Sequence, residues 1–228
     1  MSPPFPTLRF EHAYWTRGIT HVAGLDEVGR GAWAGPVVAA AVILPRVRRI
    51  KDWAAQDALR ELELARDSKL LSPAQREKLF EPICAAALAY ATGLATHEEI
   101  DVLGIVPATR LAMQRALEAL TVPIGALLID AIKLPAFALP QKAIIHGDQL
   151  SLSIACASIL AKVTRDRMMV ELETEFPGYA FGQHKGYGTA AHQAALQKLG
   201  VCRIHRASFA PIRDLSANLA NLANPNQD

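Results

Sequence analysis

The sequence predicts a mixed α/β fold with a helical C-terminal portion. Five short apolar runs have the length of β-strands, and helix start signals lie between several of them. The run 37–44 is apolar throughout rather than alternating, as expected of a strand covered on both faces. The elements follow in the order strand, strand, helix, strand, helices, strand, strand, helices, which favours one mixed sheet flanked by helices.

Local signals place the individual elements. Ser72-Pro73-Ala74-Gln75 supplies a serine N-cap, a proline at the first helical position and a glutamine at the third, and Thr96-His97-Glu98-Glu99 is a second capping box. Strands are expected at residues 22–25, 37–44, 90–95, 125–129 and 142–145. Helices are expected at 72–87, from 96 to near Gly104, onward from Pro107, at 153–175 and at 189–199, with a glycine-rich basic loop at 181–189.

The 228 residues are expected to form a single domain over residues 16–214, which includes the C-terminal helical part. Residues 1–15 carry three prolines and predict a flexible leader. Residues 215–228, rich in Asn and Ala, predict a flexible tail. Neither an internal repeat nor a clear linker divides the chain.

Composition indicates a globular protein of a reducing compartment. Cys84, Cys156 and Cys202 are odd in number and form no C-x-x-C pair, so we expect neither a disulfide framework nor a thiolate zinc site. The N-terminus lacks a secretory signal and no apolar run could span a bilayer, which predicts a cytoplasmic protein. The net charge of +2 allows a polyanionic partner without requiring one, so a nucleic-acid site would be a local basic patch.

Acidic residues follow several of the predicted strands. Asp26 and Glu27 end the first, Asp130 follows the apolar run GALLI, and Asp148 follows AIIHG. Active sites of open α/β sheets lie at strand ends, so these carboxylates are expected to converge. Buried carboxylates repel one another unless a cation intervenes, and oxygen-only ligands suit Mg²⁺ or Mn²⁺. A pair of such ions is the usual device for phosphodiester hydrolysis.

The plain alternative is that each acid is a strand-terminal cap or turn former, and we assign Asp67 to that class. Asp26 and Glu27 also raise a geometric question. Neighbouring strand residues point to opposite faces. One of the two must therefore sit on the turn, or the metal must also take a backbone carbonyl.

Basic and hydroxyl groups offer candidate phosphate contacts. Gly29-Arg30-Gly31 is either a plain tight turn or a backbone that approaches a sugar-phosphate chain closely. Ser158, Lys162 and Arg165 share one helical stripe, which is either a solvated face or a phosphate-tracking surface.

The loop motif HKGYGT places His184, Lys185 and Tyr187 among glycines. Tyr187 could stack on a sugar or a base. It could equally be an ordinary loop aromatic.

Together the motifs AGLDEVGRG, DSKLLS, LLIDA, HGD, ASILAKVTRDR, FGQHKGYGT and HRASFAP, in this order over about residues 21–212, resemble type 2 ribonuclease H, the ribonuclease HII family. The resemblance implies a ribonuclease H-like fold with a five-stranded mixed sheet. It implies an endonuclease that cuts the RNA strand of RNA–DNA hybrids and incises 5′ of single ribonucleotides in duplex DNA. The products would carry 3′-hydroxyl and 5′-phosphate ends, and the cofactor would be Mn²⁺ or Mg²⁺.

The resemblance also implies residue roles. Asp26, Glu27, Asp130 and Asp148 would be the catalytic, metal-binding acids. Gly29, Arg30 and Gly31 would read the ribose 2′-hydroxyl, which distinguishes RNA from DNA. Tyr187 would stack on the deoxyribose that follows the ribonucleotide, and Ser158 and Lys162 would contact phosphates. The partners would be RNA–DNA hybrid and ribonucleotide-containing duplex, bound by a monomer that has no membrane partner.

Several positions depart from the commoner pattern of that family. Ala131 follows Asp130 where glycine is usual, and His146 precedes Gly147 where lysine is usual. Cys156 replaces an alanine, and Ala32-Trp33 replaces Pro-Leu. No catalytic acid is lost.

The sequence also allows two other functions to be compared with this one. The first is a nucleic-acid-binding protein on the same fold that has lost its chemistry, against which the presence of all four acids argues. The second is a different phosphoryl-transfer enzyme. The chain lacks G-x-x-x-x-G-K-[ST] and G-x-G-x-x-G, which argues against nucleoside triphosphate and dinucleotide chemistry.

Overall fold

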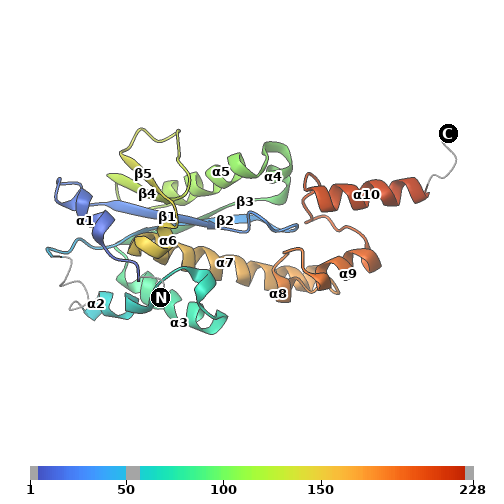
Figure 1. The fold of residues 1–228 in the computed structure, drawn as a ribbon, viewed down its shortest axis with the longest axis horizontal. Helices are drawn as coiled ribbons and strands as arrows, with labels where there is room; N and C mark the ends of the chain where they lie inside the picture. Colours follow the sequence, from blue (N-terminus) through green and yellow to red (C-terminus); the bar gives the residue numbers. More distant parts are fainter. Residues whose placement is uncertain (1–4, 50–56, 224–228) are drawn as a thin grey trace. The chain divides into compact units, whose positions relative to one another are not determined.

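The computed structural model describes residues 5–49 and 57–223, and within them five strands form one mixed sheet. β1 pairs antiparallel with β2 and parallel with β4, and β4 pairs parallel with β5. The predicted α/β fold with a five-stranded mixed sheet is therefore confirmed. The strands are β1 (Val22–Val28), β2 (Val37–Ile43), β3 (Ala89–Ala95), β4 (Ala126–Asp130) and β5 (Gln141–Ile144), in the spatial order β3-β2-β1-β4-β5 (Figure 1).

The helices begin close to their predicted starts. Both capping boxes are present, at Ser72 and at Thr96. One helix begins at Ile105 rather than at the predicted Pro107, because the first turn of a helix does not use the N–H that proline lacks. The α-helices are α1 (Arg9–Trp15), α2 (Asp57–Arg60), α3 (Pro73–Ala86), α4 (His97–Leu103), α5 (Ile105–Glu118), α6 (Gly147–Leu150), α7 (Leu152–Glu175), α8 (Phe181–His184), α9 (Ala190–Leu199) and α10 (Ala210–Ala223), and two 3₁₀ helices are η2 (Glu61–Leu64) and η3 (Ser68–Leu70).

Contacts along the chain define two compact units. The first comprises Met1–Val28, Val38–Leu94 and Thr109–Thr164, and the second comprises Gly29–Val37, Ala95–Ala108 and Arg165–Asp228. The division into one domain of residues 16–214 with a leader and a tail stays a prediction. Among the described residues, no helix has both the length and the apolar character needed to cross a bilayer.

The first unit holds most of the sheet and its larger core. Figure 1 shows α3 and the first part of α7 on one face of the sheet and α5 on the other. β2 is buried along its whole length, as its apolar sequence predicts. The core on the α3 and α7 side includes Val22, Ala40, Val42, Ala126 and Leu128 from the strands and Leu79, Ile83, Leu160 and Val163 from the two helices.

The segment predicted as a flexible leader contains an ordered helix. Residues 1–4 lie outside the described residues, but α1 follows the prolines and buries Leu8 and Trp15 in the core of the first unit. Glu11 is also buried: Ser151 Oγ, Ser153 N and Ser153 Oγ all donate to its Oε1, at 2.6, 2.9 and 2.6 Å. Burial raises the pKa of Glu11 despite these hydrogen bonds.

The second unit has its own core around Met169, Tyr179 and Phe181. The predicted loop 181–189 is shorter than expected, because its first four residues form α8. Thr189 then caps α9. The predicted tail is helical up to Ala223, consistent with the high helix propensity of Ala and Leu, while residues 224–228 lie outside the described residues.

Two residues with side chains adopt the left-handed backbone region beside the predicted acids. Ala131, directly after β4, and His146, directly before α6, both have φ of 56°. Glycine adopts this conformation without steric cost, whereas a Cβ atom makes it unfavourable. The family's usual glycine after the strand acid therefore has a conformational reason.

We predict that Ala131→Gly raises the free energy of unfolding by about 0.5–1 kcal/mol, because relief of left-handed strain outweighs the added freedom of the unfolded chain. The same change at Ala85, an exposed position within α3, should lower it by about 0.5–1 kcal/mol. Denaturant unfolding of both variants measures the two changes. Equal destabilisation by both would contradict strain at Ala131.

Candidate active site

Four carboxylates gather at the ends of neighbouring strands in the first unit. The parallel ladder between β1 and β4 ends at Leu25 opposite Ile129, so Asp26 and Asp130 come next on the two strands. Asp148 lies in α6, whose first residue, Gly147, donates its N–H to Asp130 Oδ1 at 2.7 Å. The chain thus ties α6 directly to the end of β4.

Asp26 lies deepest in this cluster. It is 5% exposed, and its Oδ1 accepts a hydrogen bond from Glu27 N at 2.7 Å. Its pKa lies well above the usual range because of burial and then because of the charges of Glu27, Asp130 and Asp148. All three other acids therefore lie close enough to repel a charge at Asp26.

The structure answers part of the question raised by the adjacent pair Asp26 and Glu27. Both lie within β1, opposite Ala40 and Ala39 of β2, so the expectation that one of them could sit on a turn is wrong. The strand continues to Val28 because its pairing with β2 outlasts the apolar run. Asp26 is buried and Glu27 is half-buried.

Asp148 belongs to the same cluster and also contacts a further acid. Burial raises its pKa to about 6, with contributions from the charge of Asp67, the charge of Asp130 and a hydrogen bond with Asp67, while Lys69 opposes the shift. Asp148 is nearly inaccessible to solvent.

Asp67 and Lys69 are site residues that the sequence did not single out. Asp67 is a helix cap, as expected, since its Oδ1 accepts from Lys69 N at 2.9 Å at the start of η3. It also lies beside Asp148, which no local signal indicates. Burial lowers the pKa of the Lys69 ammonium, but the charges of Asp67, Asp148, Asp26 and Asp130 together raise it above its usual value. The only available signal was their place in the motif DSKLLS.

The predicted polar stripe on α7 is not a solvated face. In the first unit, Ser158 is buried and its Oγ donates to Ser68 Oγ at 2.8 Å, while Lys162 is half-buried. In the second unit, Arg165 is fully buried and donates to three backbone carbonyls, those of Pro36 (2.8 Å), Ala34 (3.1 Å) and Lys185 (2.8 Å). The hydrogen bonds of Arg165 therefore link two backbone segments of the second unit, one at residues 34–36 and one at Lys185.

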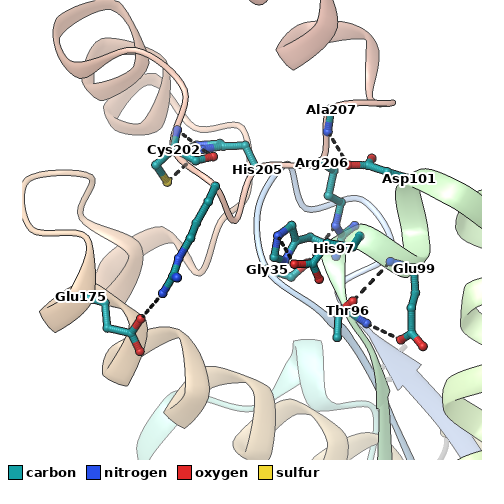
Figure 2. Close-up of polar contacts among 12 residues, drawn as sticks. Gly35, Thr96, His97, Glu99, Asp101, Glu175, Cys202, His205, Arg206 and Ala207 are labelled. Atoms are coloured by element: carbon teal, nitrogen blue, oxygen red, sulfur yellow. Dashed lines mark hydrogen bonds and ion pairs between the residues drawn. The ribbon is translucent and has the colours of Figure 1, made fainter.

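The Gly29-Arg30-Gly31 turn lies in the second unit, where two arginines support it. Gly29 has φ of 94°, and a Cβ there would lie 2.2 Å from Arg165 Nε, so only glycine fits. Arg206 Nη1 donates to Arg30 O at 3.0 Å. Its Nε donates to Gly35 O, also at 3.0 Å (Figure 2). A Cβ at Gly31 would meet open space.

Tyr187 lies in the loop between α8 and α9 of the second unit. Its ring is half-buried, and the Arg165 guanidinium lies 5.5 Å from the ring centroid. This geometry is a cation–π contact. It fixes the ring from one side.

The carboxylate cluster fits a hard divalent cation by its chemistry. Its donors are all oxygens, and the repulsion that raises the pKa of Asp26 is what a dication would relieve. In residues 5–49 and 57–223 no group of three or more Asp, Glu, His or Cys side chains is already arranged around one ion position.

Comparisons with known proteins agree on one family. The family model described as Ribonuclease HII matches residues 23–212. The chain is 50% identical over 206 residues to a ribonuclease HII of Dehalococcoides mccartyi, which covers 90% of this chain and 93% of the relative. It is 51% identical over 219 residues to one from Roseiflexus castenholzii, covering 96% and 95%.

A solved structure agrees with the sequence comparison. The ribonuclease H2 of Pyrococcus horikoshii OT3 superimposes with a TM-score of 0.67 at 25% identity, covering 87% of this chain and 98% of that one. These matches confirm the resemblance drawn from the motifs and the ribonuclease H-like fold.

We predict that Asp148→Asn stabilises the metal-free protein. Because the pKa of Asp148 is about 6 when folded and about 4 when unfolded, the wild-type side chain contributes stability below the unfolded pKa that is lost as pH rises through 6. Asparagine carries no charge, so the variant should gain on the order of 1 kcal/mol at about pH 8 and almost nothing at about pH 4.5. Unfolding in the presence of a chelator at both pH values measures this.

Asp101→Asn is a matched control for that gain. Asp101 lies in the second unit and accepts a hydrogen bond from Ala207 N at 2.9 Å (Figure 2). It also accepts from Ser208 N (2.8 Å) and Ser208 Oγ (2.6 Å). Loss of its charge should weaken these bonds and lower stability. A gain of the same size at both positions would show that repulsion at Asp148 is not the cause.

Proposed function

The chain belongs to the ribonuclease HII family, and on that premise we propose that it hydrolyses the RNA strand of RNA–DNA hybrids and incises on the 5′ side of single ribonucleotides embedded in duplex DNA, leaving 3′-hydroxyl and 5′-phosphate ends. Membership of the family makes the protein a nuclease, as the sequence predicts. The observation that supports the rest is the carboxylate cluster, in which Asp26 and Asp130 directly follow the last paired residues of the parallel ladder between β1 and β4.

Asp26, Glu27, Asp130 and Asp148 would hold Mn²⁺ or Mg²⁺ in this proposal. When bound, such a cation supplies positive charge beside the scissile phosphate and favours the ionised form of a water. The role of the four acids is to bind the cation and to keep it in a fixed position. Gly147 N donates a hydrogen bond to Oδ1 of Asp130, and Glu27 N donates one to Oδ1 of Asp26. These bonds orient each carboxylate, and its Oδ2 would be the oxygen that binds the cation.

Substrate recognition would fall to the turn and to α7. Gly29, Arg30 and Gly31 would contact the ribose 2′-hydroxyl, and the open space around Gly31 leaves room for a close approach. Lys162 and Ser158 would contact phosphates. The Ser158 hydroxyl donates to Ser68, so it would exchange that bond for one to the substrate.

Tyr187 would stack on the deoxyribose that follows the ribonucleotide and so sense the junction between RNA and DNA. Its support is the Arg165 contact, which orients the ring. We further propose a cytoplasmic monomer, consistent with the three free cysteines. A binding protein without chemistry is disfavoured because all four acids are present.

We predict that Asp130→Asn lowers cleavage by roughly a thousandfold or more, as expected when one member of a cooperating catalytic group is lost, with duplex binding nearly unchanged. Asparagine keeps the oxygen that accepts from Gly147 N, so α6 should stay in place. The assay uses two labelled duplexes, one with a single ribonucleotide and one a long RNA–DNA hybrid, each with Mg²⁺, Mn²⁺ or chelator. Near wild-type cleavage by this variant would exclude the metal-site assignment, and no cleavage by the wild type with any ion would favour the binding protein.

We predict that Tyr187→Ala slows incision at a lone ribonucleotide by about tenfold, the effect of losing one stacking contact. Binding to plain duplex DNA should change much less, because backbone contacts dominate it. Incision rates and duplex dissociation constants of the same preparation give the comparison. Equal losses in both would refute the junction-sensing role.

A further inference from the structure

Three histidines that the proposed function does not use form a buried cluster in the second unit. His184 ends α8, His192 lies in α9 and His205 precedes α10, and all three are at most 9% exposed. The rings of His184 and His192 stack at 4.4 Å between centroids. His192 and His205 meet through their Nε2 atoms, which are 3.0 Å apart. For these two nitrogens to form a hydrogen bond, one of them must carry a proton and donate it while the other accepts.

One end of this contact fixes the proton position on His192. Its Nδ1 lies 3.0 Å from the backbone oxygen of Tyr187. A carbonyl oxygen only accepts, so Nδ1 carries the proton and donates. In the neutral ring, Nε2 of His192 is then an acceptor.

His205 completes the contact. Its Nδ1 lies 3.0 Å from the backbone N of Cys202 and 3.1 Å from the backbone O of Cys202, so these partners alone allow Nδ1 either to accept or to donate (Figure 2). Because Nε2 of His192 accepts, the proton of neutral His205 lies on Nε2, and its Nδ1 accepts from Cys202 N. One chain of hydrogen bonds then runs from Cys202 N–H through His205 and His192 to Tyr187 O.

Both rings stay neutral at ordinary pH. Burial lowers the pKa of His192 to about 4 and also lowers that of His205. His184 is held separately, since its Nδ1 accepts from Gly186 N at 3.1 Å and its Nε2 donates to Tyr179 O at 2.7 Å. The cluster thus forms hydrogen bonds with the backbone at Gly186 N, before Tyr187, and at the carbonyl oxygen of Tyr187 itself.

The backbone at Tyr187 needs such support. Gly186 and Gly188 flank it, and Gly186 has φ of 78°, so no side chain of a sequence neighbour restricts its conformation. Trp33 N donates to Gly186 O at 2.8 Å and Tyr187 N donates to His184 O at 3.0 Å, but neither bond involves the Tyr187 carbonyl. Thr189 N donates to the same Tyr187 oxygen at 2.8 Å, which leaves His192 as its second donor. Arg165 meets the ring and also binds Lys185 O.

We propose that His192 and His205 are positioning residues that hold the Tyr187 carbonyl and thereby aim the Tyr187 ring at the substrate. The inference rests on the proposed role of Tyr187 as the junction contact. The effect of the two histidines on cleavage passes through Tyr187.

The kinetic test compares two replacements of His192. Asparagine places a side-chain N–H near the position of Nδ1 and keeps the donation to Tyr187 O, whereas phenylalanine keeps the ring stacked on His184 and removes both nitrogens. His192→Phe should slow incision at a lone ribonucleotide by about fivefold, the factor expected for one ordinary hydrogen bond, with plain-duplex binding unchanged. His192→Asn should recover most of the rate.

A double-mutant cycle shows whether the effect passes through Tyr187. With Tyr187→Ala present, His192→Phe should cause no further loss, because both changes remove the same contact. Additive losses would overturn the proposal. If Tyr187→Ala slows incision but His192→Phe does not, positioning fails while the function of Tyr187 stands; if Tyr187→Ala itself has no effect, both fail.

A spectroscopic readout tests the hydrogen bonds without any variant. Imidazole ¹⁵N spectra of the unaltered protein near neutral pH should show His192 protonated on Nδ1 and His205 protonated on Nε2. The reverse tautomer at either residue would overturn the chain of hydrogen bonds, whatever the kinetics of the variants.

Discussion

The parallel pairing of β1 with β4 is the constraint on which the carboxylate cluster depends. The ladder brings Leu25 opposite Ile129, and the next residue on each strand is an acid. A shift of one residue in either strand would turn its acid to the opposite face of the sheet. The register is held because the strand residues before the acids are buried in the core. Apolar packing therefore decides where the charges meet.

Bringing these charges together costs stability, and the chain offsets part of that cost locally. Backbone N–H groups donate to Asp26 and Asp130, and the Lys69 ammonium adds opposite charge at the rim. The left-handed conformation of Ala131 adds strain at the same place. Repulsion and strain concentrate where the chemistry is proposed, while the apolar core beneath carries the fold.

The sequence predicted what depends on neighbours in the chain. The caps at Ser72 and Thr96 and the apolar strands were found because their signals span a few residues. Partners distant in the chain were missed: Asp67 meets Gln149 across 82 positions, and Arg165 meets Ala34 across 131. A helical stripe shows that residues share a face but not what covers that face. A turn at Asp26 or Glu27 was one of two alternatives that the sequence left open, and it was wrong because the pairing partner β2 lies outside the local pattern.

The hydrogen bonds of Glu11 bear on the order of events during synthesis. Its partner Ser151 follows it by 140 positions. β1 likewise pairs with β4, a strand that lies far downstream in the sequence. Contacts of such long range close late, since the intervening chain must first be ordered. A nascent chain that has emerged only through β3 has neither the partner of α1 nor the second half of the acid cluster. The start of α7 must therefore be made before Glu11 and the acids of β1 can meet all of their partners.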